Sequence, residues 1–395
     1  MSLEPSVDTL DPGQVRANLT EAAELGPTAQ DALTGAVWVF GYNEIERLAR
    51  DSRLEGVGMT MFDLMGIEGE LRLWYGSLMF ANEGAEHIRL RRLVNRAFTT
   101  RSTEQLRADA AASVEALLDE LASNGEGDLV AMFERLPIRV MCRLLGVPEE
   151  DISTFAGWAD ALSRVFTFME PSEIAAAESA LSELLDYVAN LVRRRQADPG
   201  EDLITSLLRA EDEGDRLSRD EVITMVSNLL VAGHDTTRSQ IGCSLAAMLS
   251  HPDCLERLRG GEATLGSAVA ETMRYEPNIS GIPRTVKQEV EVGGITREQG
   301  AFILLAVMIG NRDPSVWDDP NGFDVSRFDA PSAPRLLSFG TGPHFCLGTN
   351  LARMTLEETL QGTLLRPIEL LCAPEDIKWQ QVLGRSPVSL PVTIR

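Results

Sequence analysis

A single cysteine stands in a glycine-rich stretch near the C-terminus, where residues 338–353 read SFGTGPHFCLGTNLAR. Gly340 and Gly342 permit tight turns and a close approach of the backbone to a flat ligand. Gly348 begins a predicted helix, whose first N–H groups favour a thiolate at Cys346 over the thiol. A thiolate in such a loop is suited to bonding a soft metal or to nucleophilic catalysis.

These two chemistries require different neighbours for Cys346. A nucleophilic cysteine needs a base, and His344 lies two residues away with no orienting acid evident beside it. As a single metal ligand, the cysteine needs a metal that arrives with its other ligands attached, as the iron of a porphyrin does. The residues alone therefore leave open a haem protein and a cysteine hydrolase.

The remaining cysteines are scattered along the chain, and no C-x-x-C pair is present. This pattern indicates neither a disulfide framework nor a zinc site. We interpret these four as small core residues: Cys142, Cys243, Cys254 and Cys372.

The elements that must position the cysteine loop are mainly helical. Hydrophobic periodicity predicts helices over residues 84–98, 103–123, 127–145, 149–168, 171–196, 218–250, 264–276 and 348–365. Short β-like segments cover 283–296 and 388–394, and residues 311–334 contain four prolines and no periodicity. The chain is predicted to be one mainly α domain over residues 1–395 with a minor β part.

The predicted helix 218–250 is long enough to cross the whole molecule, and Ser218 and Glu221 form a capping box at its start. Its middle carries Gly233, Asp235 and Thr236, where a central helix should be apolar. Such an interruption indicates function, or a polar kink with Asp235 facing solvent; both interpretations stay open here.

The chain carries 60 acidic and 36 basic side chains, a formal charge of −24. This balance opposes general binding to nucleic acid or to anionic membranes. The N-terminus lacks the pattern of a secretory signal, and the longest apolar run, residues 301–310, is far shorter than the ~20 residues of a spanning helix. We expect a soluble, cytoplasmic protein without membrane contact.

One local exception to the acidic balance is the basic stretch RLRRLVNRAFTTR at residues 89–101. It could dock an acidic partner, hold an anionic cofactor, or be an ordinary solvated helix face. Its arginines are Arg89, Arg91, Arg92, Arg96 and Arg101.

Five segments together resemble the cytochrome P-450 family of haem-thiolate monooxygenases. FGTGPHFCLG at 339–348 closely matches the family's cysteine-ligand loop, and AGHDTT at 232–237 resembles its oxygen-activation segment. ETMR at 271–274 is similar to the family's E-x-x-R pair. EHIRLRRLV at 86–94 and IPRTV at 282–286 resemble the segments that contact the haem propionates. They occur in the family's order between residues 86 and 353.

The resemblance implies a single-domain cytochrome P-450-like fold with a long central helix over haem b, and a role for each matched residue. Cys346 is the expected axial ligand of the iron, and Phe339 is expected to shield its sulfur from water. The other expected haem contacts are the small residues Ala232, Gly233, Gly340 and Gly348, together with His87, Arg91, Arg284 and His344 at the two propionates.

Two further sets of residues receive roles from the resemblance. Asp235 and Thr236 are expected to deliver protons during oxygen activation, with the Thr236 hydroxyl bonded back to the carbonyl of Ala232. The structural ion network of Glu271, Arg274 and Arg327 is expected to fix the 311–334 segment against a helix.

The function implied is insertion of one atom of O2 into a hydrophobic small molecule, with electrons from a separate acidic ferredoxin or flavodoxin. A peroxide-driven peroxygenase and a non-catalytic haem-based sensor are the alternatives. The resemblance places the substrate pocket in residues 58–80, 165–170 and 278–282 and the turn near Pro387. Its apolar candidates, each of which could instead be core packing, are Met59, Met61, Phe62, Met65, Trp74, Phe166 and Phe168.

Overall fold

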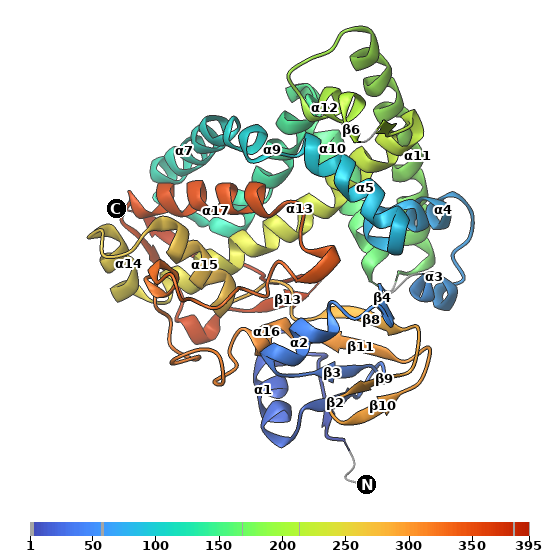
Figure 1. Cartoon of the computed structure of the whole chain (residues 1–395). Helices are drawn as coiled ribbons and strands as arrows, with labels where there is room; N and C mark the ends of the chain where they lie inside the picture. Colours follow the sequence, from blue (N-terminus) through green and yellow to red (C-terminus); the bar gives the residue numbers. More distant parts are fainter. Residues whose placement is uncertain (1–3, 57–58, 168, 213, 382–383, 395) are drawn as a thin grey trace.

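The computed structural model describes residues 4–56, 59–167, 169–212, 214–381 and 384–394. Most of the chain is helical, as predicted (Figure 1). The α-helices are α1 Val15–Leu25, α2 Tyr42–Leu48, α3 Thr60–Met65, α4 Gly69–Ser77, α5 Gly84–Ala97, α6 Thr100–Glu104, α7 Arg107–Asn124, α8 Leu129–Phe133, α9 Leu136–Leu145, α10 Ile152–Ser163, α11 Pro171–Ala197, α12 Leu203–Arg209, α13 Arg219–Leu249, α14 Pro252–Arg259, α15 Leu265–Tyr275, α16 Val307–Gly310 and α17 Thr349–Leu364.

The main β-sheet has six strands in the order β1-β2-β3-β11-β8-β4 and lies at the N-terminal side of the molecule (Figure 1). Residues 283–296 form β8, β9 and β10, and the C-terminal segment forms β15, so both β predictions are confirmed. The strands are β1 Ser6–Val7, β2 Thr28–Asp31, β3 Val37–Val39, β4 Leu54–Glu55, β5 Glu126–Asp128, β6 Glu211–Asp212, β7 Asp215–Arg216, β8 Ile282–Val286, β9 Val290–Val292, β10 Ile295–Arg297, β11 Phe302–Leu305, β12 Ile368–Leu370, β13 Trp379–Gln381, β14 Arg385–Pro387 and β15 Pro391–Ile394.

The predicted helices over 103–123 and 127–145 each proved to be two helices. Residues 100–124 divide into α6 and α7, and residues 129–145 divide into α8 and α9. Pro137 lies in the first turn of α9, where backbone N–H groups have no intrahelical acceptor. The N–H that proline lacks therefore costs the helix no hydrogen bond. The N-terminal helices α1 to α4 escaped prediction because most of them are too short to show a full period of apolar residues.

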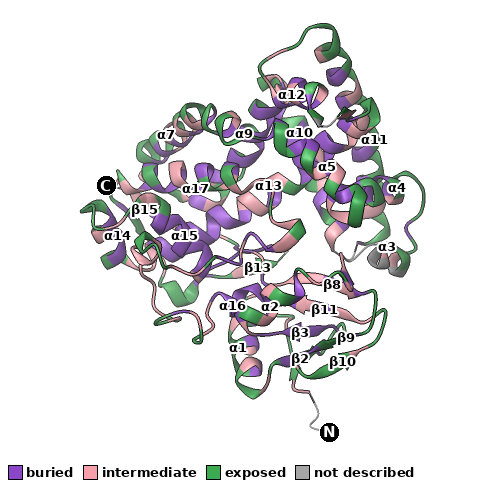
Figure 2. Cartoon of the chain, viewed as in Figure 1, coloured by how far each residue is buried: buried purple, intermediate pink, exposed green. Residues whose placement is uncertain are grey.

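Helix α13 is the central element of the fold. The hydroxyl of Ser218 accepts from the N–H of Glu221, and the Glu221 side chain bonds the Ser218 N–H, which confirms the predicted capping box. The helix runs unbroken from Arg219 to Leu249 and packs against α9, α10, α11, α15 and α17. Because neighbours cover it on most sides, most of its side chains are buried (Figure 2). None of the described helices is both long and apolar enough to cross a lipid bilayer.

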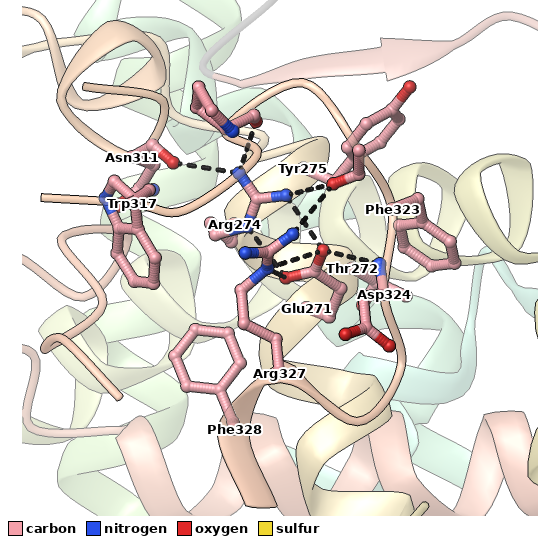
Figure 3. A network of polar contacts seen from close by, with 12 residues as sticks. Glu271, Thr272, Arg274, Tyr275, Asn311, Trp317, Phe323, Asp324, Arg327 and Phe328 are labelled. Atoms are coloured by element: carbon pink, nitrogen blue, oxygen red, sulfur yellow. Dashed lines mark hydrogen bonds and ion pairs between the residues drawn. The ribbon is translucent and has the colours of Figure 1, made fainter. Parts of the chain in front are cut away.

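A buried ion network joins α15 to the irregular segment 311–334 (Figure 3). Glu271 and Arg274 are both fully buried, and their side chains form two hydrogen bonds of 2.7 and 2.8 Å. Arg327 adds a second cation, 3.1 Å from the Glu271 carboxylate, and the Asp324 N–H donates to the same carboxylate at 2.8 Å. These contacts are the ones predicted for the network: they hold the segment against a helix.

The guanidinium of Arg274 connects the network to the cysteine loop by way of Asn311. It donates to the carbonyl oxygens of Asn311, Pro320 and Gly322 at 3.1, 2.7 and 2.7 Å (Figure 3). The Asn311 side chain in turn donates to the Ser338 hydroxyl at 2.8 Å and accepts from a backbone N–H at residue 337 at 3.0 Å. The start of the cysteine loop is therefore anchored to α15 through side chains.

We predict that Glu271→Gln lowers the free energy of unfolding by about 3–5 kcal/mol, because it removes the only anion that compensates two cations in this described network. Urea unfolding of the purified protein measures this loss. The matched control is Glu149→Gln, which removes an exposed ion pair with Arg139 and should change stability by less than ~1 kcal/mol. Equal losses in the two variants would contradict a special role for the buried network.

Candidate active site

A partly enclosed cavity of about 360 Å³ lies between α13, α5, β8 and the cysteine loop. The structure brings all ten residues predicted to contact a cofactor into its wall, although they are spread over more than 260 positions of the chain. They are His87, Arg91, Ala232, Gly233, Arg284, Phe339, Gly340, His344, Cys346 and Gly348.

The backbone of the cysteine loop requires glycine at two positions. Gly340 and Gly342 have φ angles of 71° and 76°, in the left-handed region that other residues rarely adopt. A Cβ atom on Gly342 would also lie 2.7 Å from the carbonyl oxygen of Ala49. The N–H of Cys346 donates to the Phe339 carbonyl at 2.9 Å, which closes the loop and turns the sulfur toward the cavity.

The Cys346 side chain is exposed to the cavity, yet surrounding protein still desolvates its sulfur. Burial raises the pKa of the Cys346 thiol, and this outweighs the lowering by the Gly348 N–H, the Thr349 side chain and the charge of Arg91. The predicted lowering by N–H groups at the helix start is present at Gly348, but it does not by itself bring the pKa of the thiol below its ordinary value. A bound metal cation would supply the missing stabilisation, because it replaces the thiol proton outright.

Two arginines in the cavity wall form no ion pair within the described residues, although the charge of Glu83 acts on Arg284. Arg284 is 9% exposed and Arg91 is half-buried, and burial lowers the pKa of both guanidinium groups. Arg91 donates to the carbonyl of Phe345 at 2.6 Å, and Arg284 donates to that of Pro283 at 2.9 Å. Their remaining N–H groups fit an anionic ligand with two acidic groups beside the cysteine, as haem b has in its propionates.

The two histidines of the cavity wall already contact protein oxygens. The rings of His87 and His344 lie 4.1 Å apart, and the Nε2 atom of His344 is 2.9 Å from the Glu83 carboxylate. The ring nitrogens of His87 lie 3.0 and 3.2 Å from the carbonyl oxygens of Met79 and Pro343. His344 is thus committed to Glu83, which leaves a nucleophilic Cys346 without the base that the hydrolase alternative needs.

Helix α13 presents Ala232, Gly233 and Thr236 to the cavity. The Thr236 hydroxyl donates to the Ala232 carbonyl at 2.8 Å, as expected, but the helix continues without a break. Gly233 also serves packing, because a Cβ atom there would lie 2.4 Å from the terminal methyl of Met141 on α9. The Asn278 amide donates to the Thr236 carbonyl at 3.1 Å and supports this face from outside the helix.

Asp235 lies on the outer side of α13 and not in the cavity wall. It is 1% exposed, one carboxylate oxygen binds Arg238, and the other is buried without a hydrogen-bond partner in the described structure. Arg238 also reaches the carboxylates of Asp160 at 3.2 Å and Glu134 at 3.4 Å. His234, which has no sequence-based role, is buried with its Nε2 atom 3.2 Å from Asp160.

The apolar candidates for a substrate pocket lie mostly elsewhere. Phe62 is fully buried in the core, and the buried Trp74 donates its indole N–H to the Ser227 hydroxyl at 2.9 Å. Phe166 stands behind the cavity residue Phe80, with ring centroids 5.6 Å apart. Phe168 and the Met61 side chain lie outside the described residues. Of the predicted segment 278–282, Asn278, Ile279 and Ile282 line the cavity.

Sequence reasoning missed several cavity residues on α13. Asn228 and Gln240 line the cavity with Ala232 and Thr236, at a spacing of four residues. Side chains four apart share one helix face, so counting in fours from Thr236 would have found them.

The basic stretch 89–101 is only partly available for other molecules. Arg89 forms ion pairs with Glu86, Asp215 and Glu221, which tie α5 to β7 and to the start of α13. Arg91 turns inward to the cavity.

Comparison with known proteins agrees with this geometry. The sequence profile of the family Cytochrome P-450 matches residues 61–261 and 264–388. The 6-deoxyerythronolide B hydroxylase of Saccharopolyspora erythraea is 34% identical over 395 residues, covering 96% of this chain and 95% of the relative. The mycinamicin IV hydroxylase/epoxidase of Micromonospora griseorubida is 37% identical over 316 residues, with 78% and 77% covered.

Solved structures show the same architecture. The crystal structure of CalO2 superposes with a TM-score of 0.89 at 28% identity, covering 98% of this chain and 99% of that chain. The predicted fold class is thereby confirmed. With a profile match over most of its length and relatives above 30% identity, this chain belongs to the cytochrome P-450 family, the haem b-dependent monooxygenases that use O2 and a redox partner to oxidise small molecules.

Proposed function

We propose that the whole chain forms one haem-binding domain that oxidises a hydrophobic small molecule with O2 and electrons delivered singly by a separate acidic ferredoxin or flavodoxin. The observation that carries this proposal is that the Cys346 sulfur and the Thr236 hydroxyl line one largely apolar cavity. Cys346 would ligate the iron, and Arg91 and Arg284 would bind the two propionates. When bound, haem b supplies the centre at which O2 is activated.

Thr236 is proposed to hold the last proton donor before the oxygen. Its hydroxyl hydrogen is directed to the Ala232 carbonyl, which leaves its oxygen lone pairs free to accept from a water molecule in the cavity. A water oriented in this way can present a proton inside the cavity while the apolar wall excludes bulk solvent.

Asp235 is proposed to bring protons from the surface to Thr236. Arg238 holds it on the outer side of α13 beside Asp160 and Glu134, whose side chains are 51% and 53% exposed. Movement of Arg238 toward these two carboxylates would release Asp235 for transfer. This exchange of partners is supported by the ion pairs that Arg238 makes with Asp235 on one side and with Asp160 and Glu134 on the other.

An acidic electron donor is supported by arginines that flank the cysteine loop. The guanidinium of Arg335 lies 4.7 Å from the Phe345 ring centroid, and that of the exposed Arg353 lies 5.4 Å from the Phe339 ring centroid. Arg101 adds an exposed cation at the end of the basic stretch. On a protein with a formal charge of −24, such a local basic surface favours and steers an acidic partner.

A polyketide is the substrate class to test first, because the names of two relatives refer to 6-deoxyerythronolide B and mycinamicin IV. Terpenoids, steroids and fatty acids complete the panel. Titration of the purified haem protein with each class, followed by the Soret band, identifies compounds that enter the cavity.

We predict that the reduced protein under carbon monoxide shows the strongly red-shifted Soret band of a haem thiolate, and that Cys346→Ser abolishes it. The change removes the axial sulfur while keeping nearly the same side-chain size. Cys372→Ser is the matched control and should keep the band. A red-shifted band that survives Cys346→Ser would overturn the assignment of the ligand.

We predict that Thr236→Ala still consumes reductant but releases hydrogen peroxide in place of product, because the cavity loses its proton-relay hydroxyl. Peroxide and product are measured together in a reaction reconstituted with a ferredoxin and its reductase. Thr363→Ala removes an equivalent hydroxyl bond to a helix carbonyl, far from the cavity wall, and should stay coupled. Fast turnover of the wild-type protein and of Thr236→Ala with hydrogen peroxide alone would favour the peroxygenase alternative instead.

We predict that Asp235→Asn slows product formation by about 10²-fold, because an amide does not replace a carboxylate in proton transfer. Asp202→Asn is the control, since the Asp202 side chain is 7% exposed and is also paired with an arginine, Arg195, but does not line the cavity. A larger solvent isotope effect on product formation in the Asp235 variant should accompany the lower rate. An unchanged rate would remove Asp235 from the proton route.

A further inference from the structure

Asn228 is a polar side chain of the cavity wall to which the mechanism gives no task. It lies on α13, it is 4% exposed, and its amide makes no hydrogen bond to any described residue. Buried amides in folded proteins are almost always hydrogen-bonded, because an unmatched donor or acceptor loses its bonds to water. A partner for this amide must therefore come from within the cavity.

The other two amides of the cavity wall are engaged by the protein itself. Gln240 donates to the Ser244 hydroxyl at 3.2 Å and to the Glu276 carbonyl at 3.1 Å, and it accepts from the Asn278 N–H at 3.0 Å. The Asn278 amide donates to the Thr236 carbonyl at 3.1 Å. The contrast marks Asn228 as an amide that no packing or capping requirement explains.

The position of Asn228 separates it from the reacting end of the cavity. It stands eight residues before Thr236, which corresponds to about 12 Å along the axis of α13. Apolar side chains share the wall with it, among them Met79, Phe80, Met141 and Leu229. Asn228 is therefore placed to meet a part of the substrate remote from the atom that is oxidised.

We propose that Asn228 is a specificity-determining residue that hydrogen-bonds a hydroxyl or carbonyl oxygen of an otherwise apolar, uncharged substrate. The proposal rests on the proposed function and narrows its substrate class to oxygen-bearing lipophiles, in preference to plain hydrocarbons. An amide both donates and accepts without charge, so it recognises either oxygen group and offers no ion pair to a carboxylate. In an apolar wall, one such group discriminates strongly, because an analogue without the oxygen leaves the amide unpaired.

The test uses pairs of N-alkylimidazoles of increasing chain length, one member ending in a methyl group and the other in a hydroxyl group. The imidazole anchors each probe to the haem iron, and the shift of the Soret band reports its Kd. At the chain length that reaches Asn228, the ratio of the methyl to the hydroxyl Kd should fall roughly five- to tenfold in Asn228→Leu compared with the wild-type protein.

Two further variants make the result decisive. Asn228→Ala should lose the hydroxyl preference in the same way, and it replaces the leucine variant if that protein does not fold. Leu229→Met is the matched control in the cavity wall, is nearly equal in volume, and should keep the wild-type ratio. A ratio that is the same in wild type and both Asn228 variants at every chain length would overturn the proposal and assign the amide to water.

The same titration separates this inference from the function on which it rests. Soret shifts without a hydroxyl preference contradict only the role of Asn228. A purified wild-type protein without a Soret band would instead contradict the haem site, and with it both proposals.

Discussion

The buried charge network around Glu271 and Arg274 is the interaction on which the arrangement of the active site depends. A charge pair without solvent contact persists only when its hydrogen-bonding capacity is filled, and here backbone carbonyls of the irregular 311–334 segment fill it. The same guanidinium therefore orders a stretch that has little regular secondary structure. The Asn311 side chain then donates a hydrogen bond to Ser338, which fixes the start of the cysteine loop.

Much of the fold and of the site could be predicted because it is encoded locally. The long helix 218–250 has periodic apolar residues and a capping box, and the glycines at 340 and 342 mark turns that other residues do not make. The motifs that resemble one family then predicted which residues line the cavity. Each signal of this kind is contained in a few consecutive residues, so it can be recognised in the sequence without knowledge of the packing.

The parts that escaped prediction depend on which way side chains point after packing. Asp235 turned away from the cavity toward Arg238, and Phe62 and Trp74 packed into the core, although all three had plausible positions in the sequence. The ion pairs of Arg238 join residues 78 and 104 positions apart, a separation that no periodic pattern records. His344 became the partner of Glu83 for the same reason.

Arg91 and Arg284, the two cavity arginines that form no ion pair within the described residues, have a consequence for the stability of the protein. Burial lowers the pKa of both guanidinium groups, and only part of this effect on Arg284 is offset by the charge of Glu83, so both cations carry a desolvation cost in the folded polypeptide. A dianionic cofactor would offset this cost, and its binding would stabilise the native state by an amount that rises with the logarithm of its affinity. The two arginines thus link the binding of the cofactor to the stability of the polypeptide that surrounds it.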